Sequence, residues 1–556
     1  MEDKKRRKYM RLTDNEEINR LLSTVVSSVK DFTESQFEHI RSLTQIGAAL
    51  SAESNIDRLL EMILEEARRF TNADGGTLYI MSDDEKRLHF AIVETGSMNV
   101  HMGGTSGKIT WPPVELYNQD GSPNYSNVSS YAALSGEVVN IADVYHAEAF
   151  NFEGTRQYDA DTGYRSQSML VVPMRNHEND IIGILQLINA QDRETGDTVP
   201  FSVFSQELTE SLASLAAIAL TKNSLIMELQ NLFESFVTTI ASAIDEKSPY
   251  TGDHGRRVVE LTMMIAGTIN KMDYGPFETV SFDSDHLNEL RIAAWLHDVG
   301  KIAIPEYVMD KPTKLTTVHD RIEVLLTRIE VLKREIENDV LRKELVKRGA
   351  YDEESIKKKC AGKIKGLEDD YTFLELMNRG SEFVTDEHLK RLKKLGRKPW
   401  TADGTRQSFL TDDEMKNLTI SRGTLTNEER EIINNHAAIT FRMLSQMPFP
   451  KKLRNIPVYA GSHHEYINGR GYPLGLKGED IPLQSRILAL ADVFEALTAS
   501  DRPYRKANTL SQAVKILGFM VKDNHLDADL FELFIDQKIH IEYAKKELSK
   551  SQLDEM

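Results

Sequence analysis

Five histidines and two aspartates in the last 310 residues of the chain are candidate metal ligands. They are His254, His297, Asp298, His436, His463, His464 and Asp492. Asp492 lies within an apolar run from Ile487 to Phe494, where a carboxylate is costly to bury unless it is paired or binds a cation. Imidazole and carboxylate ligands suit iron, manganese, nickel, cobalt or zinc, and the absence of thiolates argues against a structural zinc site. Seven ligands exceed the needs of one tetrahedral metal, so we expect two metals that share a carboxylate.

Two divalent metals roughly 3.5–4 Å apart are the usual arrangement for phosphodiester cleavage. A hydroxide that bridges them has a lowered pKa and attacks phosphorus, while the metals neutralise the developing charge. Lys301 follows Asp298 by one helical turn, so its ammonium would point at the phosphate from the same face. A solvated lysine at the end of a helix is the alternative for Lys301.

Two longer motifs contain most of these residues. The first is His297–Ile302 followed by Pro305, and the second runs from His463 through Gly471-Tyr472-Pro473. Over about residues 236–315 and 424–540 the chain resembles the HD-GYP family, a branch of the HD superfamily of metal-dependent phosphohydrolases. The resemblance implies a phosphodiesterase that hydrolyses cyclic di-GMP to pGpG or GMP. A hydrolase of cyclic GMP-AMP and a catalytically weak cyclic di-GMP receptor are the alternatives.

The resemblance also implies a role for each residue. One metal would be held by His254, His297, Asp298 and Asp492, and the other by Asp298, His436, His463 and His464. Iron or manganese is expected first, with nickel, cobalt or zinc as alternatives. Asp298 and Lys301 would be catalytic, with Asp298 bridging the metals and Lys301 on the scissile phosphate. The implied substrate-binding residues are Lys301, Tyr472, Glu495, Arg502 and Arg505. Arginine forks suit phosphate or guanine, and surface solvation is the alternative for the two arginines.

Two positions depart from the pattern of the family. Asn468 stands where the family usually has Asp, but that residue is not a ligand. Members with three metals carry Glu four residues before the first histidine, where this chain has Tyr250. Tyrosine is a poor ligand for a divalent metal at neutral pH. We therefore expect two metals per chain.

The elements before this region predict a domain of helices and strands. Apolar residues at one helical spacing, from Ile56 to Leu64, predict a helix over residues 51–70. Residues 77–81 and 88–93 predict a hairpin, and residues 169–173 and 181–188 predict two more strands. Helices before and after an antiparallel sheet predict an α+β domain over residues 41–225.

Three stretches of this domain, residues 143–146, 162–170 and 183–189, resemble the GAF domain, a small-ligand sensor fold. GAF domains that bind cyclic nucleotides often carry an Asn-Lys…Phe…Asp-Glu signature. Here Asn189 is followed by Ala190, and no Asp-Glu pair follows Phe201 or Phe204 at the expected distance. The resemblance therefore implies a domain that senses an unknown small ligand and regulates the C-terminal domain. A GAF fold used only for dimerisation or signal relay is the alternative.

A heptad-like apolar pattern from Leu208 to Ala243 predicts a long helix over residues 205–245. It favours a homodimer through the 208–243 helix, with Lys222 as a polar register residue, and a helix packed on its own domains is the alternative. Residues 236–556 would then form an all-α HD-GYP domain. Residues 316–425 predict a helical insertion within it, either an appended hairpin or a regulatory contact, and residues 1–40 predict a further helical segment.

Composition limits the remaining classes of function. The chain has 68 Lys and Arg against 86 Asp and Glu, a net charge of −18, so it is a poor nucleic-acid binder. No apolar run is long enough for a membrane helix, and the basic N-terminus lacks the apolar core of a secretory signal. Cys360 is the only cysteine, which excludes an intramolecular disulfide and fits a reducing cytosol. We therefore expect a cytoplasmic bacterial protein that binds neither membrane nor nucleic acid.

Overall fold

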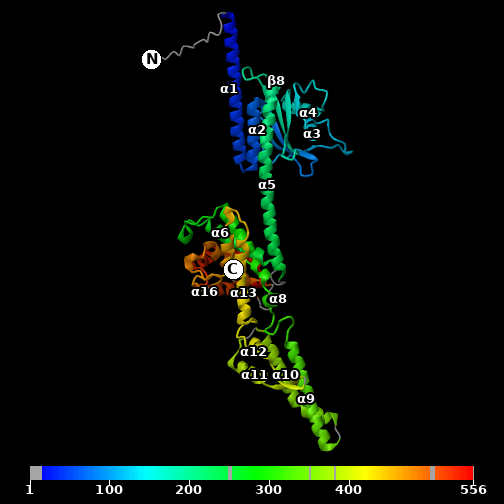
Figure 1. The fold of residues 1–556 in the computed structure, drawn as a ribbon, viewed down its shortest axis with the longest axis vertical. Helices are drawn as coiled ribbons and strands as arrows, with labels where there is room; N and C mark the ends of the chain where they lie inside the picture. Colours follow the sequence, from blue (N-terminus) through cyan, green and yellow to red (C-terminus); the bar gives the residue numbers. More distant parts are fainter. Residues whose placement is uncertain are drawn as a thin grey trace. The chain divides into compact units, whose positions relative to one another are not determined.

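The computed structural model describes residues 16–247, 253–349, 352–380, 383–402, 404–500 and 507–554. The chain divides into two compact units, Met1–Leu232 and Phe233–Met556. Helix α5 (Val203–Lys247) begins in the first unit and ends in the second (Figure 1).

The first unit is built on an antiparallel sheet with the strand order β3-β2-β1-β7-β6-β5. The strands are β1 (Ala73–Met81), β2 (Arg87–Thr95), β3 (Val100–Gly103), β5 (Val139–Ile141), β6 (Met169–Arg175) and β7 (Ile181–Gln191). Two short strands, β4 (Val114–Glu115) and β8 (Thr198–Val199), pair with β2 and β7. The predicted hairpin and the two further predicted strands are confirmed as β1–β2 and β6–β7.

Helices cover both faces of this sheet. On one face lie α1 (Glu16–Ala52), α2 (Ile56–Thr71) and the first part of α5, and on the other lie α3 (Val128–Ser135) and α4 (Glu153–Thr162) (Figure 1). The predicted apolar face of α2 is buried in the core, which confirms the α+β class. The helix predicted over residues 51–70 begins at Ile56, because residues 51–52 end α1 and residues 53–55 are not helical. The boundary predicted between residues 40 and 41 falls inside the continuous helix α1. Asn189 is buried and bonds the backbone of Gln167 and Arg165, so it shapes a loop of the domain.

The heptad pattern of α5 does not form one free seam. Leu212 and Ala219 are buried in the core of the first unit, as the alternative of a helix packed on its own domain requires. Lys222 donates a hydrogen bond to the carbonyl oxygen of Ser51 at 2.5 Å. It thus provides a partner for a carbonyl group in the last turn of α1, in the same chain. Leu229, further along the pattern, is 66% exposed. An apolar repeat identifies a face to be covered but not the surface that covers it.

Helix α5 is also the one helix of the described chain that is long and apolar enough to cross a membrane. Of its most apolar window, 39% is buried inside the protein. A core helix of this length passes the same test, so the finding is weak evidence for a membrane segment.

The second unit is helical, which confirms the predicted all-α class. Its main helices are α6 (His254–Ile269), α7 (Ser284–Leu296), α8 (Glu306–Met309), α13 (Asn427–Ser445), α14 (Ile456–Gly461), α15 (Leu483–Thr498), α16 (Leu510–Lys522), α17 (Ala528–Asp536) and α18 (Ile539–Glu547). Helix α15 is buried along most of its length and packs against α6, α16 and α17 in one core. This burial explains its nearly continuous apolar sequence.

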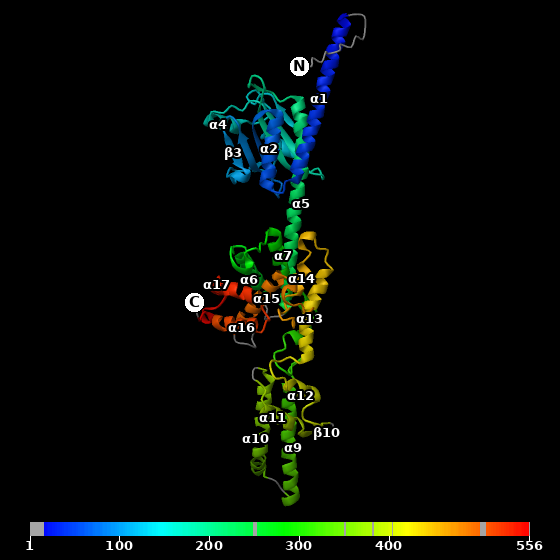
Figure 2. The same ribbon diagram turned by 90° about the vertical axis from the view of Figure 1, so that its left-hand side faces the viewer.

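The inserted region forms a small helical body beyond one end of α13 (Figure 2). It contains α9 (Ile322–Arg348), α10 (Glu353–Asn378), α11 (Asp386–Gly396) and α12 (Asp412–Leu418), so the region predicted as a helical insertion is mostly helical. Its two ends are tied together, because Lys311 pairs with Glu429 at 2.8 Å and Lys314 donates to the carbonyl of Ile420 at 2.8 Å. A hairpin of β9 (Pro399–Ala402) and β10 (Thr405–Ser408) was not predicted.

Candidate metal centre

The seven predicted ligands come from separate elements of the second unit and converge on one place. His254 is the first residue of α6, and His297 and Asp298 follow α7 directly. His436 lies within α13, His463 and His464 follow the end of α14, and Asp492 lies within α15. Segments up to 238 residues apart in the sequence thus contribute to one cluster, since His254 Nε2 lies 3.5 Å from Asp492 Oδ1.

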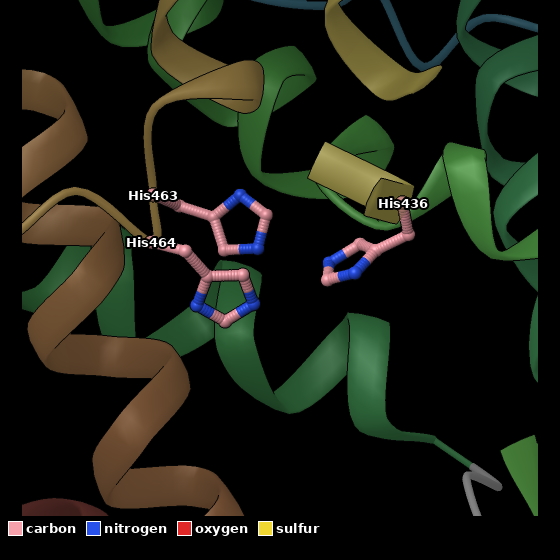
Figure 3. Close-up of side chains that lie close together, drawn as sticks. All are labelled: His436, His463 and His464. Carbon is pink, nitrogen blue, oxygen red and sulfur yellow. The ribbon is translucent and has the colours of Figure 1, made fainter. Parts of the chain in front are cut away.

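The ligand atoms form three overlapping groups, each within 4.8 Å, that could hold a metal ion. These are His254, His297 and Asp492; His436, His463 and His464; and His297, Asp298 and His463. Figure 3 shows the second group, with the three imidazoles turned toward one another. Asp298 lies between the groups, because its Oδ2 is 3.3 Å from His297 Nε2 and its Oδ1 is 3.3 Å from His436 Nε2.

The imidazole rings are oriented by hydrogen bonds at their outer nitrogens. The Nδ1 atoms of His297, His436 and His463 donate to the backbone carbonyls of Ala294, Ile433 and Ala460 at 2.6–2.7 Å. The Nδ1 atom of His254 lies 2.5 Å from a carboxylate oxygen of Glu495. Each ring is therefore held at its outer nitrogen and turns Nε2 inward, the nitrogen that would bind a metal in its unprotonated form.

The four inward nitrogens have no hydrogen-bond partner. Nε2 of His254, His297, His436 and His463 is buried and unbonded among the described residues. Buried polar atoms are nearly always satisfied, so four unbonded nitrogens that face one centre point to a common partner. A divalent cation is such a partner, and the observed donor set therefore fits one.

The charges around the cluster favour the deprotonated forms of His463, His464 and Asp298 and positive charge at His254 and His297. Burial and the neighbouring imidazoles hold the pKa of His463 and His464 well below the usual range, so both rings are neutral. Burial would raise the pKa of Asp298, but Lys301 and His297 outweigh it and hold that pKa well below its usual value. For His254, burial would lower the pKa, but Glu495 and the nearby aspartates raise it to about 10. The position of His254 thus favours positive charge, whether a proton or a metal ion supplies it.

Lys301 lies at the edge of this cluster. Its ammonium pairs with Oδ2 of Asp298, and its backbone N–H donates to the carbonyl of Asp298 at 2.9 Å. Both residues belong to the short 3-10 helix η3 (Val299–Ala303) and its N-cap. The side chain of Lys301 is 24% exposed, so a substrate phosphate at the cluster could reach its ammonium.

Gly300 allows η3 to approach α13. A Cβ at this position would lie 2.1 Å from the carbonyl oxygen of His436. The N–H of Gly300 donates to Oγ1 of Thr440 at 2.9 Å, and that hydroxyl donates to the carbonyl of His297 at 3.0 Å. These contacts fix the distance between Asp298 and His436.

The loop after the His463-His464 pair is organised by Glu465, a residue that sequence reasoning missed. Its buried carboxylate accepts hydrogen bonds from the N–H groups of Leu474, Gly475 and Leu476 at 2.6, 3.1 and 2.9 Å. Within the loop, the ring of Tyr472 lies 4.9 Å from the ring of His464. The predicted substrate residue Tyr472 is thus brought beside the second ligand group. The signal in the sequence was an acidic residue just before a glycine-rich turn.

Glu495 requires a correction. We expected a substrate contact, but the side chain is fully buried, with one oxygen on His254 and the other 2.7 Å from Nε of Arg257. Burial would raise its pKa, but His254 and Arg257 outweigh it and lower the pKa to about 2. Glu495 therefore orients His254, and Arg257 is its partner, a residue that sequence reasoning also missed.

Three other residues singled out in the sequence lie outside the described residues, namely Tyr250, Arg502 and Arg505. Asn468 is described, and its side chain donates to the carbonyl of Asp523 at 2.9 Å. This contact ties the loop to the end of α16, so Asn468 has a structural role here.

Comparison with protein families assigns both parts of the chain. Residues 55–220 match the family model of the GAF domain, and residues 412–530 match that of the HD domain. The chain carries a GAF domain and an HD domain. The matched part of the HD domain contains four of the seven clustered residues, His436, His463, His464 and Asp492.

Among the curated relatives that match part of the chain, two illustrate the likeness. The chain is 39% identical over 113 residues to the 3′3′-cGAMP-specific phosphodiesterase 1 of Vibrio cholerae, a match that covers 20% of this chain and 25% of that protein. It is 32% identical over 165 residues to a cyclic di-GMP phosphodiesterase of Thermotoga maritima, covering 26% of this chain and 44% of that protein. The chain thus spans less than half the length of each relative.

Solved structures match about a third of the chain. A GAF domain from an Acinetobacter phosphoenolpyruvate-protein phosphotransferase is 12% identical, with a TM-score of 0.26, and the match covers 34% of this chain and 98% of that structure. The GAF domain/HD domain protein from Geobacter sulfurreducens is 13% identical, with a TM-score of 0.23, and the match covers 32% of this chain and 98% of that structure.

Proposed function

We propose that the chain is a metal-dependent phosphodiesterase that opens a cyclic dinucleotide. The observation that carries this proposal is the set of four buried imidazole nitrogens that face one centre without a partner. Neutral imidazoles and ionised carboxylates at one centre are a donor set for divalent metals that cleave phosphodiesters.

We assign the ligands to two ions. The first would be held by His254, His297, Asp298 and Asp492, and the second by Asp298, His436, His463 and His464. The two oxygens of Asp298, one toward His297 and the other toward His436, support a bridging role. Iron and manganese are the ions we expect first.

Two such ions, when bound, supply a nucleophilic water and neutralise charge on the phosphate. The ammonium of Lys301 would then exchange part of its pairing with Asp298 for an oxygen of the scissile phosphate. Tyr472, beside His464, would pack against the nucleotide at the rim of the site. Arg502 and Arg505 remain candidates for binding phosphate or guanine.

The substrate class is inferred from the relatives. One relative is named for cyclic di-GMP and another for 3′3′-cGAMP. We propose cyclic di-GMP as the substrate, with pGpG or GMP as product, and cyclic GMP-AMP as the alternative. A second candidate function is a cyclic di-GMP receptor with little turnover.

The first unit would regulate this activity. We propose that the GAF domain responds to a small ligand and that the chain is a cytoplasmic homodimer. The exposed apolar residues Ile226, Leu229 and Phe236 on α5 support a dimer contact in that part of the helix. Scattering that gives a monomer at micromolar concentration would remove the dimer from the proposal.

A substrate panel tests the function. Purified protein is incubated with cyclic di-GMP or cyclic GMP-AMP under Mn²⁺ or anaerobic Fe²⁺, and products are separated by chromatography. We expect a linear dinucleotide or GMP from at least one substrate. Tight binding without product under either metal would favour the receptor, and neither binding nor product would refute both functions.

A further inference from the structure

Lys247, the last residue of α5, reaches across to the backbone of η3. Its ammonium donates hydrogen bonds to three carbonyl oxygens, those of Lys301 at 3.2 Å, Ile302 at 2.6 Å and Ile304 at 2.7 Å. An ammonium group has three donors and no acceptor, so these three carbonyls can use its whole capacity.

The carbonyls involved are those at the end of a short helix. Residues Val299–Ala303 form η3, and Ile304 is its C-cap. The last carbonyls of a helix lack partners within the helix, and a lysine from elsewhere can satisfy them. Lys247 therefore caps the C-terminal end of η3 with a side chain from another helix.

The same short helix carries two residues of the candidate site. Asp298 is its N-cap, and Lys301 lies one turn later with its ammonium on the Asp298 carboxylate. On one side η3 is held to α13 through Gly300 and Thr440. On the other side Lys247 holds it to α5.

The last turn of α5 also contacts the other half of the cluster. A carboxylate oxygen of Asp245 accepts a hydrogen bond from the N–H of Gly255 at 3.4 Å. Gly255 follows His254 in the first turn of α6. Two residues of one helical turn thus contact the backbone beside His254 and beside Lys301.

We propose that Lys247 is a positioning residue for the phosphodiester reaction, which fixes the backbone of Lys301 and thereby the aim of its ammonium. This inference rests on the proposed function. Because α5 is also the helix that leaves the GAF domain, this turn is the point where a shift of the helix would reach Lys301. Regulation would then act on turnover through Lys301, while the seven metal ligands stay in place.

Three variants test the role. Lys247→Met keeps the length of the side chain but removes the donors, and Lys247→Arg restores charge and donors. Glu246→Gln changes the exposed neighbouring residue and is the matched control. For each protein we would measure kcat, KM, metal content, and hydrogen exchange of the amides of residues 299–304 with and without metal.

We expect kcat of Lys247→Met to fall on the order of ten- to a hundredfold, because a small misplacement of a catalytic group costs that much. KM and metal content should stay close to those of the wild type, and exchange at residues 299–304 should become faster. Lys247→Arg should recover much of kcat, and Glu246→Gln should behave like the wild type.

Unchanged kcat and unchanged exchange in Lys247→Met would overturn the proposal. Loss of metal together with activity would also overturn it, because Lys247 would then support the whole centre. If the wild type cleaves no cyclic dinucleotide, the proposed function fails. Hydrogen exchange of residues 299–304 in the metal-free proteins then tests the structural part alone. If exchange in Lys247→Met equals that of the wild type, Lys247 does not hold η3 in place.

Discussion

Replacing Glu495 with glutamine should weaken one metal position and spare the other. Glu495 is fully buried, with one oxygen 2.5 Å from Nδ1 of His254 and the other 2.7 Å from Nε of Arg257. The guanidinium can only donate, so the amide oxygen of the glutamine must face Arg257. Its NH₂ group then faces Nδ1 of His254. The ring would have to accept there and carry its proton on Nε2, the nitrogen that must be bare to bind metal.

The size of the effect follows from the bond that is lost. A hydrogen bond to a charged group contributes about 1.5–3 kcal/mol, which corresponds to about ten- to a hundredfold in affinity. Loss of an outer partner of a metal-binding histidine typically costs the same factor. Calorimetric titration of the metal-free variant with Mn²⁺ should therefore show one site weakened by this factor and one site unchanged.

A matched control exists in the insertion. Glu414 is also buried and pairs with Arg328 at 2.7 and 3.0 Å, but it contacts none of the seven clustered residues. Glu414→Gln should lower the free energy of unfolding and leave both metal affinities unchanged. The role assigned to Glu495 would be refuted if Glu495→Gln weakened neither metal site. It would also be refuted if Glu414→Gln weakened metal binding as much as Glu495→Gln does.

Two further predictions concern packing and pH. Gly300→Ala should abolish Mn²⁺ binding at one or both metal positions, because its Cβ would lie 2.1 Å from the carbonyl oxygen of His436. Gly255→Ala is the control, because the closest contact of its Cβ is 3.4 Å, and it should bind Mn²⁺ normally in the same titration. Normal binding by Gly300→Ala would contradict the close approach of η3 to α13. Burial lowers the pKa of Lys314 from 10.5 to about 8, so between these pH values the unfolded chain holds a proton that the folded chain has released. Raising the pH through this window should therefore stabilise the wild type relative to Lys314→Met by about 3 kcal/mol in denaturant unfolding, and a constant difference would contradict the buried lysine.

The sequence predicted the cluster because metal chemistry restricts residue types. Asp492 stood out as a carboxylate in an apolar helix, and the structure places it beside His254. The helix α2 was predictable because one of its faces is buried, and the strand β7 was predictable from its nearly continuous apolar run. The β9–β10 hairpin was missed because all four side chains of β10 are exposed and carry no apolar alternation.

What the sequence could not supply is the partner of each side chain. The repeat on α5 indicated an apolar face, but not that Leu212 and Ala219 pack on their own domain. Glu495 follows Asp492 by three residues on α15, yet only the fold shows that His254 and Arg257 occupy both of its oxygens. Lys247 gave no signal, because its partners are backbone carbonyls that any sequence provides.

Turnover measured against bound metal tests the central claim most directly. Metal-free protein is titrated with Mn²⁺ while linear product from cyclic di-GMP and cyclic GMP-AMP is followed by chromatography, in the wild type and in Asp298→Ala. We predict that turnover of at least one substrate rises to a maximum near two equivalents per chain, and that Asp298→Ala loses metal and turnover together. Full turnover in Asp298→Ala, or a maximum at one or three equivalents, would contradict a two-metal site bridged by Asp298.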